Sequence, residues 1–454
     1  MFLRQILHDD LGCASYLIAS DGEAAVVDPK WEIGAYLQAA AEVDAEIRHV
    51  LETHFHADHV SGRRRLVGAT GAVPHVPADP QRRRAGGLRD GDTVSVGAVT
   101  LMVLATPGHR PEHLAYLATE PDRPGARAAL LSGDSLLIGE LARPDLAVEA
   151  EDGARALWAT VRRLTALDDS VEVWPGHVGG SLCGSGALCE RTSSTIGEER
   201  STNPWLSVRD VDAFVQELTR GVPARPPRVE RVVALNLRGA GAVGPVRELD
   251  PNGFATFVAA GACVLDVRSP DVFDLGHVAG AVNLPAGGQG LGTRAGWALA
   301  PGESAVIVSQ TLEDGRDTVS LLYAAGVDSV GVSVADPDGW AVGGLPVERA
   351  HAFAPRELVP LLEADDVQLV DVRDRVEWKQ GHVAGSLHLP LHELRDGSAV
   401  VLSDRRPLAI ACAGGRRAAL AASVLRRRGR RDVSRVTGGV ADLADRGVAL
   451  VAGE

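Results

Sequence analysis

The chain has 454 residues, of which 45% are hydrophobic and 23% are charged, and its formal net charge is −14. This length exceeds what one hydrophobic core usually supports, so we expect two or three globular domains, and the acidic charge argues against a nucleic-acid partner. The N-terminal sequence lacks the apolar core of a signal peptide, and no apolar run reaches the roughly 18 residues of a membrane span. We therefore expect a cytoplasmic protein without a membrane partner. Five scattered cysteines, an odd number, do not predict a disulfide framework.

Residues 1 to 240 contain several predicted strands that end in polar motifs. The apolar run AAVVDP delivers Asp28, and IRHVLETH leads into His54. Further along, AVTLMVLATPGH ends at His109, AALLSGD at Asp134 and VEVWPGH at His177. Because each polar residue follows an apolar, β-branched stretch, we expect the strand ends to converge at one edge, where loops gather side chains from distant parts of the chain.

The stretch THFHADHVSG, residues 53 to 62, places His54, His56, Asp58 and His59 within six positions. An isolated histidine such as His109 would more often be a satisfied polar group at the start of a loop. The ordered set HxHxDH, PGH, GD and PGH is too specific for that interpretation. It predicts a metal site.

With this order of motifs, residues 1 to 240 resemble the metallo-β-lactamase superfamily. The resemblance implies an αβ/βα sandwich with the metal site between the sheet edges. One alternative within the superfamily is a hydrolase like glyoxalase II, in which paired metals generate and orient a hydroxide. One zinc would then use His54, His56 and His109, the other would use Asp58, His59 and His177, and Asp134 would bridge them.

The other alternative is a persulfide dioxygenase, which uses the same motif for one Fe(II). The resemblance then implies the ligands His54, His109 and Asp134, a two-histidine, one-carboxylate face that leaves positions open for substrate sulfur and O₂. The stretches TPGHRPEHLAYL, SGDSLLIGELARPDL and SSTIGEERSTNPWL look like this branch and favour iron. Further residues are implied to orient the ligands and the substrate: His56, Asp58, His59, His177, Arg143 and Asp145.

The segment after the last histidine departs from the glutathione-using enzymes of that branch. Val178 and Gly179 replace an aromatic residue that those enzymes commonly carry, so the thiol carrier stays open. Cys183 lies six residues after His177 in the loop GGSLCGSG. It is predicted either as a substrate-handling thiol near the metal or as a small apolar filler. We expect the same filler role for Cys13, Cys189 and Cys263.

The C-terminal half contains a repeat. VLDVRSPDVFDLGHVAGAVNLP at residues 264 to 285 matches LVDVRDRVEWKQGHVAGSLHLP at 369 to 390, with an offset of 105 residues and no gap. An offset of this length is typical of a duplicated compact domain, and the alternation of strands with helical segments predicts a parallel sheet in each copy. We therefore expect an α/β protein with domains at residues 1 to 240, 241 to 350 (the first copy) and 351 to 454 (the second copy).

The second copy ends in PLAIACAGGRRAALAASVLRRRG, which predicts a strand, a glycine-containing loop with Cys412, and a helix. Backbone N–H groups of the loop, the helix N-terminus, and Arg416 or Arg417 would lower the pKa of the thiol and stabilise an anionic sulfur. The motif CAGGRRA resembles the rhodanese active-site loop, and both copies are similar to rhodanese domains. The implied role of Cys412 is to accept sulfane sulfur as a persulfide and to pass it on.

The first copy carries Ser309 where the second carries Cys412. Its loop is also acidic, through Glu313 and Asp314, which would repel an anionic sulfur. We therefore expect the first copy to be a non-catalytic scaffold that packs the other two domains.

The order of the three domains resembles fusions of persulfide dioxygenase and sulfurtransferase in bacterial sulfide detoxification. The resemblance implies iron-dependent oxidation of a low-molecular-weight thiol persulfide by O₂ to sulfite and thiol, in a chain that could form a homo-oligomer. Cys412 would carry a second sulfur, joining it to sulfite as thiosulfate or working in reverse. Two alternatives stay open: a zinc-dependent thioester hydrolase with an appended sulfurtransferase, and a non-enzymatic sulfane-sulfur carrier with a structural metal.

Overall fold

The computed structural model describes residues 1–8, 12–78, 87–123, 125–178, 191–220, 222, 225, 227–241, 246–287, 290–394 and 405–453. The chain divides into two units, Met1–Ala242 and Val243–Glu454. The first unit carries the predicted metal motifs, and the second carries both copies of the repeat. Among the described helices, none combines the length and the apolar character needed to cross a membrane.

Within the described residues, two main sheets form the first unit. Their strand orders are β1-β2-β3-β4-β5 and β13-β12-β9-β8-β7-β6, and β10 pairs with β11 separately. The strands are β1 (Phe2–His8), β2 (Cys13–Ser20), β3 (Glu23–Val27), β4 (Glu46–Leu51), β5 (Val73–His75), β6 (Thr93–Val96), β7 (Val99–Ala105), β8 (Leu114–Thr119), β9 (Ala129–Gly133), β10 (Leu136–Leu137), β11 (Glu140–Leu141), β12 (Glu172–Pro175) and β13 (Ser194–Thr195). The helices are α1 (Gly34–Glu42), α2 (Arg63–Thr70), α3 (Ala150–Leu164), α4 (Ile196–Thr202), α5 (Pro204–Ser207), α6 (Val211–Leu218) and α7 (Val229–Arg238).

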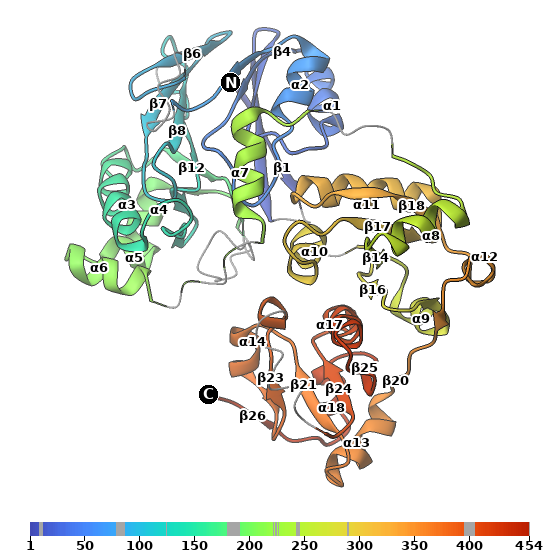
Figure 1. Cartoon of the computed structure of the whole chain (residues 1–454). Coiled ribbons are helices and arrows are strands. Elements are labelled where there is room, and N and C mark those ends of the chain that lie inside the picture. The colour runs from blue at the N-terminus through green and yellow to red at the C-terminus, as the bar shows by residue number, and fades with distance from the viewer. Residues whose placement is uncertain are drawn as a thin grey trace. The chain divides into compact units, whose positions relative to one another are not determined.

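The two sheets face each other across an apolar core, and helices cover their outer faces (Figure 1). Tyr16 of β2 packs with Tyr116 of β8 in this core. The next residue, Leu17, points to the opposite face and packs with Tyr36 of α1, as the period of two along a strand requires. On the outer face of the second sheet, Leu157 of α3 belongs to a further apolar cluster. These layers are the αβ/βα sandwich that the resemblance predicted.

In the second unit each copy of the repeat forms a parallel sheet, as predicted. The strand orders are β16-β14-β17-β18 in the first copy and β20-β25-β24-β21-β23 in the second, and every pairing within these two sheets is parallel. The strands are β14 (Cys263–Asp266), β15 (His277–Val278), β16 (Val282–Asn283), β17 (Ala305–Ser309), β18 (Ser329–Val334), β19 (Val347–Glu348), β20 (Ala352–Phe353), β21 (Gln368–Asp371), β22 (His382–Val383), β23 (Leu387–His388), β24 (Leu408–Ala411), β25 (Val433–Val436) and β26 (Leu450–Val451). The helices are α8 (Pro251–Ala259), α9 (Pro270–Leu275), α10 (Leu291–Ala298), α11 (Leu312–Ala324), α12 (Pro337–Val342), α13 (Pro355–Glu363), α14 (Arg375–Gln380), the 3₁₀ helix η1 (Leu391–Glu393), α17 (Arg416–Arg427) and α18 (Val440–Ala444).

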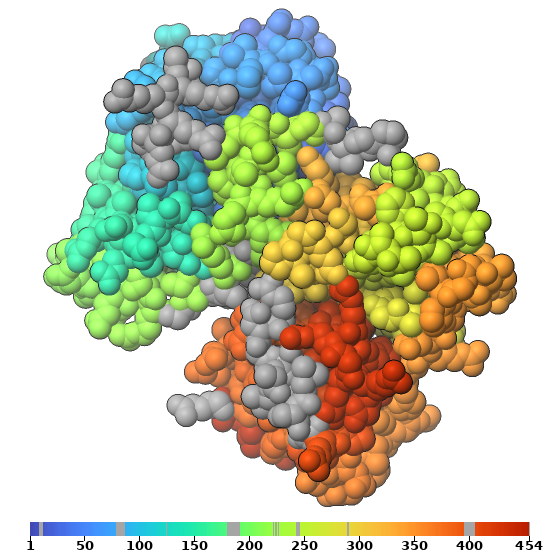
Figure 2. Space-filling model, viewed as in Figure 1, coloured from blue at the N-terminus to red at the C-terminus, as the bar shows by residue number. Residues whose placement is uncertain are grey.

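The two copies share one apolar core through helix α17. Buried Ala421 and Ala422 of this helix lie in the same cluster as Val282 of β16, because small side chains let a helix approach a neighbour closely. Ser423 of α17 accepts a hydrogen bond of 2.9 Å from the main-chain N–H of Asn283. Figure 2 shows the first copy, in yellow to orange, directly against the red second copy. Ion pairs also join the copies: Arg427 with Glu303, and Arg435 with Asp271 and Asp274.

Candidate metal centre and thiol loop

The predicted ligands follow strands of both sheets of the first unit. Asp28 comes directly after β3 and His54 shortly after β4, both in the first sheet. In the second sheet, His109 follows β7, Asp134 follows β9 and His177 follows β12. The structure brings all of these side chains together at one end of the sandwich.

Three side-chain atoms form a buried set that we call the first cluster: His54 Nε2, His109 Nε2 and Asp134 Oδ2. They lie within 4.8 Å of one another, and Asp134 Oδ2 is 3.7 Å from His54 Nε2 and 3.5 Å from His109 Nε2. None of the three atoms has a hydrogen-bond partner among the residues that the structure describes. Buried polar atoms without partners are unfavourable, so a cation held by all three would remove a penalty. Two imidazoles and one carboxylate fit iron(II) or zinc.

In two of these ligands, the side-chain atom that does not belong to the first cluster is held by a hydrogen bond. His54 Nδ1 lies 2.9 Å from Thr53 Oγ1, which itself donates a bond of 2.8 Å to Asp28 Oδ2. His177 Nδ1 lies 2.7 Å from Asp134 Oδ1. Such contacts set the orientation of a ligand and leave its remaining atom free to bind metal. His177 therefore orients Asp134 and is not part of the first cluster.

The third ligand, His109, is fixed by the loop that follows β11. Its Nδ1 donates a hydrogen bond of 2.9 Å to the main-chain carbonyl of Arg143. The Arg143 guanidinium in turn donates two bonds, of 2.7 and 2.8 Å, to the carboxylate of Asp145. Arg143 thus acts on the ligand through its backbone, while the pair of side chains shapes the loop.

Glu199 of helix α4 and Asn203, directly after that helix, hold the β10–β11 hairpin, which leads into this loop. Glu199, which is buried, accepts a hydrogen bond of 2.8 Å from the main-chain N–H of Gly139. Asn203 Nδ2 donates to the carbonyl of Glu140 at 3.1 Å and to Glu199 Oε2 at 3.0 Å. The ERSTNP segment therefore braces the hairpin that precedes Arg143.

The pKa shifts of the first cluster favour the protonation states that bind metal. Burial, aided by charge on neighbouring His56, lowers the pKa of His54 well below its ordinary value, and burial also lowers the pKa of His109. Burial would raise the pKa of Asp134, but the charge and the hydrogen bond of His177 outweigh it and lower that pKa. Near neutral pH the cluster is two neutral imidazoles and one carboxylate.

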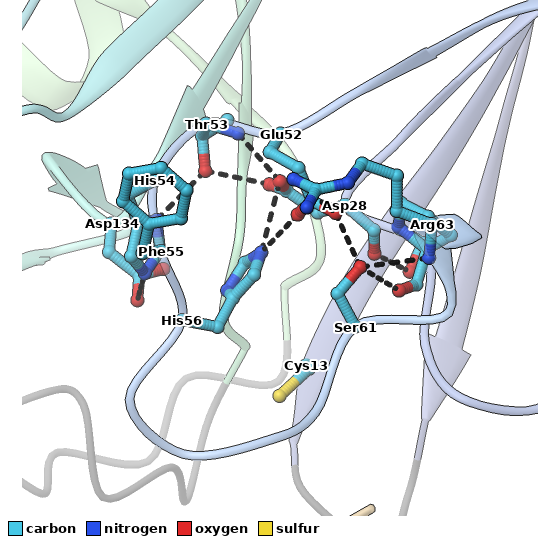
Figure 3. Close-up of polar contacts among 12 residues, drawn as sticks. Cys13, Asp28, Glu52, Thr53, His54, Phe55, His56, Ser61, Arg63 and Asp134 are labelled. Carbon is cyan, nitrogen blue, oxygen red and sulfur yellow. Dashed lines mark hydrogen bonds and ion pairs between the residues drawn. The ribbon is translucent and has the colours of Figure 1, made fainter. Parts of the chain in front are cut away.

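His56 lies beside the first cluster but points to other partners. Its Nε2 is 3.1 Å from both Asp28 Oδ1 and Glu52 Oε2, as Figure 3 shows. Burial opposes a charge on this ring, but the two carboxylates raise the pKa of His56 to about 9. Its Nδ1 is buried and has no hydrogen-bond partner in the described part of the chain.

A further set of side chains, which we call the Asp58 group, consists of Cys13, Lys30, Asp58, His59 and His177. Asp58 Oδ2 lies 3.1 Å from His177 Nε2 and 3.2 Å from Cys13 Sγ, and Cys13 Sγ is 3.0 Å from His177 Nε2. Asp58 Oδ1 is 2.9 Å from His59 Nδ1, and Lys30 Nζ is 3.0 Å from His59 Nε2. The residues of the second zinc site in the hydrolase alternative are therefore together here, with a buried lysine among them.

The charges in the Asp58 group follow from this arrangement. Burial would lower the pKa of Lys30, but the acidic groups around it, Cys13 when ionised and the Asp58 carboxylate, raise it, so the amine is an ammonium. Burial and the Lys30 charge lower the pKa of His59 to about 3, so its ring is neutral. Burial raises the pKa of Cys13, which favours the neutral thiol.

Helix α7 supports the HxHxDH loop through one buried side chain. Asn236 Nδ2 donates to the main-chain carbonyls of His56 and His59 at 2.9 and 2.8 Å, and its Oδ1 accepts from the N–H of Ser61 at 2.8 Å. In Figure 1 this helix stands in front of the strands of the first unit. Asn236 was not among the predicted site residues, because a single asparagine in RVVALNLR carries no recognisable spacing.

In the second copy, Cys412 lies between β24 and α17, where the sequence predicted it. The main-chain N–H of Gly415 donates to Cys412 Sγ at 3.1 Å, and the thiol is buried. The two predicted arginines differ in their partners. Arg417 is bound to both oxygens of Glu377 at 2.6 and 2.7 Å, whereas the Arg416 guanidinium lies beside Gly287 of the first copy.

Strand register places Ser309 at the position equivalent to Cys412. Asp266 pairs with Val308 in the first copy, and Asp371 pairs with Ala411 in the second. Ser309 Oγ donates a hydrogen bond of 2.7 Å to the carbonyl of Thr311. The hydroxyl is thus used within its own loop, which agrees with a copy that has no transferable sulfur.

The predictions for the cysteines other than Cys412 compare differently with the structure. The interpretation of Cys13 as a filler is wrong, because its sulfur contacts Asp58 and His177; its position against His177 arises from a bridge between distant segments, which no local pattern reveals. Cys263 lies in the apolar core of the second unit. Cys183 and Cys189 lie outside the described residues.

Two parts of the chain match models of known protein families. Residues 8–177 match the model of the metallo-beta-lactamase superfamily, and residues 354–445 match that of the rhodanese-like domain. A hydroxyacylglutathione hydrolase of Fuscovulum blasticum is 30% identical over 214 residues, which are 41% of this chain and 79% of that enzyme. Among eight enzymes of that name, the share of the enzyme's length that the chain spans ranges from 56% to 84%.

Two solved structures are also similar. A metallo-beta-lactamase from Staphylococcus aureus subsp. aureus COL has 28% identity and a TM-score of 0.64, and the match covers 74% of this chain and 99% of that one. ETHE1 from Myxococcus xanthus has 30% identity and a TM-score of 0.45, with 52% and 98% covered. The match to the S. aureus protein extends beyond the first unit, which ends at Ala242.

Proposed function

The chain belongs to the metallo-beta-lactamase superfamily and carries a rhodanese-like domain, and from this we propose that it is an iron-dependent persulfide dioxygenase coupled to a sulfurtransferase. In the proposed reaction, a low-molecular-weight thiol persulfide RSSH reacts with O₂ and water to give RSH, sulfite and two protons. The terminal sulfur loses four electrons, and O₂ gains them. Iron(II) bound to His54, His109 and Asp134 would supply this redox chemistry.

The main support is the contrast between the first cluster and its surroundings. In the first cluster one carboxylate oxygen and two ring nitrogens converge without hydrogen-bond partners among the described residues. In the Asp58 group, by contrast, the side chains already bind one another. Protein ligands on one side of a single ion leave its other side open for a sulfur anion and O₂.

A second support is that the stretches resembling the dioxygenase branch all act on His109. His109 itself belongs to TPGHRPEHLAYL, and its ring is held by the carbonyl of Arg143 in SGDSLLIGELARPDL. The β10–β11 hairpin that precedes Arg143 is held by Glu199 and Asn203 in SSTIGEERSTNPWL. These stretches therefore meet around His109, and SGDSLLIGELARPDL also supplies Asp134, which gives a physical reason for their joint occurrence.

The proposed sulfur transfer takes place at Cys412. Its thiolate would attack the outer sulfur of thiosulfate, so that the S–S bond of thiosulfate breaks, a new S–S bond to Cys412 forms and sulfite leaves. The N–H of Gly415, 3.1 Å from the sulfur, would stabilise its negative charge. Run in reverse, the same step converts sulfite and a Cys412 persulfide into thiosulfate.

A zinc-dependent thioester hydrolase is the second candidate, and one observation favours it. His56 Nδ1 is unpartnered among the described atoms, and a first zinc held by three histidines would use this ring. The hydroxyacylglutathione hydrolases among the similar proteins are consistent with such a site.

Oxygen uptake by the iron-loaded protein distinguishes the two candidates. The protein is purified without oxygen, loaded with Fe(II), and supplied with glutathione persulfide or coenzyme A persulfide. We expect one iron per chain and one sulfite for each O₂ consumed. His54→Ala should abolish uptake, whereas His75→Ala, a change on β5 outside the clusters, should preserve it. Absence of uptake with both persulfides rejects the proposal, and two zinc ions per chain with hydrolysis of S-lactoylglutathione supports the hydrolase.

A further inference from the structure

We infer that Lys30 keeps the metal centre mononuclear, because its ammonium group lies against the His59 ring that a second metal ion would bind. The inference rests on the single-metal centre of the proposed function and names the residue that enforces it. Without Lys30, the Asp58 group would offer zinc a thiol, a carboxylate and imidazoles, all common zinc ligands.

The Lys30 ammonium lies against the imidazole that a second metal would need. Its Nζ lies 3.0 Å from His59 Nε2 and 3.3 Å from His59 Nδ1, so it is close to both ring nitrogens at once. Because His59 Nδ1 is also 2.9 Å from Asp58 Oδ1, the consistent arrangement has Nδ1–H donating to Asp58, which leaves Nε2 as the nitrogen that a metal would bind. A metal ion on Nε2 would lie beside an ammonium of the same sign of charge.

Main-chain contacts fix the position of Lys30 beside the Asp58 group. The N–H of Lys30 donates to the hydroxyl of Tyr36 at 2.8 Å. Gly62 packs so closely on the other side that an added methyl carbon would lie 1.9 Å from the Lys30 carbonyl oxygen, and its N–H donates to the carbonyl of Pro29 at 2.9 Å. The Lys30 side chain is buried, so its ammonium is part of the site and does not reach solvent.

The Asp58 group and the first cluster differ in charge. In the Asp58 group the Asp58 carboxylate is balanced by the Lys30 ammonium, so a divalent ion would add uncompensated charge. In the first cluster the Asp134 carboxylate faces two neutral imidazoles, and a divalent ion is attracted. A purely structural role for Lys30, such as packing by its carbon chain, would not change the number of metal ions bound.

Counting metal ions in charge-altered variants tests the inference. The full-length wild type, Lys30→Met and Lys30→Arg are each incubated without oxygen with excess Zn²⁺ or Fe²⁺, freed of unbound metal, and analysed for metal per chain. We expect one ion in the wild type and in Lys30→Arg, two in Lys30→Met, and one again in Lys30→Met combined with His59→Ala. A single ion in Lys30→Met overturns the inference. Circular dichroism checks that each variant is folded. Lys30→Gln is a second neutral variant, for which we also expect two metal ions per chain.

The outcomes also separate this inference from the proposed function. Two ions in the wild type at saturation overturn both the mononuclear centre and the role of Lys30. One ion in the wild type and two in Lys30→Met, without O₂ uptake in any protein, supports the role of Lys30 and rejects the dioxygenase. O₂ uptake with one ion in both proteins rejects only the role of Lys30.

Discussion

Substitution of Gly176 by alanine should weaken metal binding at the first cluster through a single methyl group. The added carbon would lie 2.5 Å from Asp134 Oδ1 and 3.1 Å from the main-chain carbonyl carbon of Gly133. Real Cβ atoms essentially never approach another heavy atom within 3.0 Å, so the Asp134 carboxylate must turn. That rotation moves Oδ2 out of the first cluster and breaks the 2.7 Å contact between Oδ1 and His177.

The size of the effect follows from the role of that contact. Loss of a partner that orients a metal ligand lowers metal affinity by roughly 10- to 100-fold, which is about 1.4 to 2.7 kcal/mol. Gly176 is not among the glycines with positive φ, so alanine adds no backbone strain there. The change in affinity can therefore be assigned to the displaced carboxylate.

Competition with an iron chelator under anaerobic conditions measures the Kd of the variant. Gly68→Ala is the matched control, because a methyl group at Gly68 in α2 meets no atom within 4 Å and alanine is favoured in a helix. The control should keep the wild-type Kd. A wild-type Kd in Gly176→Ala, with a circular dichroism spectrum that shows an intact fold, would refute the assignment of Asp134 as a ligand held by His177.

Three further outcomes are expected. Cys412→Ser should retain O₂ uptake but lose transfer of sulfur from thiosulfate to cyanide, and normal transfer would exclude Cys412 as the carrier. Asn203→Ala should lower the free energy of unfolding by about 2 to 4 kcal/mol in urea, because it removes the buried hydrogen bonds of Asn203 to the Glu199 carboxylate and to the Glu140 carbonyl. Asn252→Ala, at an exposed position, should change it by less than about 0.5 kcal/mol. The pKa of His56 is raised from 6.5 to about 9 in the folded protein, so protonation of His56 adds about 3 kcal/mol to the free energy of unfolding. This stabilisation is fully present below pH 6.5 and is lost as the pH rises through 9. Urea unfolding of the metal-free protein from pH 6 to pH 10 should show this loss, and His56→Gln should remove it.

Much of the fold and of the first cluster could be predicted because the signals are local. His54, His109 and Asp134 each follow an apolar strand within a short motif, so their convergence required only that strand ends meet. The gapless repeat predicted parallel sheets in both copies. Counting back from Gly326 and Gly429, which end equivalent helices, placed Ser309 at the position of Cys412, and the pairing of β14 with β17 and of β21 with β24 has this register.

The residues that the sequence did not reveal depend on contacts between distant segments. Lys30 and Cys13 acquire their roles only where β2, the loop after β3 and the loop after β12 approach Asp58. Asn236 reaches the HxHxDH loop from a helix about 180 residues later in the chain. None of the three belongs to a spaced motif, and each residue type has a common structural role, so composition and periodicity gave no reason to select them.

Helix α17 begins at the thiol loop and rests its alanine face on β16 of the first copy. The copy with Ser309 at this position thus supports the helix that carries the thiol loop of the other copy. A bulkier side chain at Val282 would push this helix away from β16 and would displace the thiol loop at its N-terminus, so the sulfur-transfer site depends on packing in a copy that has no cysteine in its own loop.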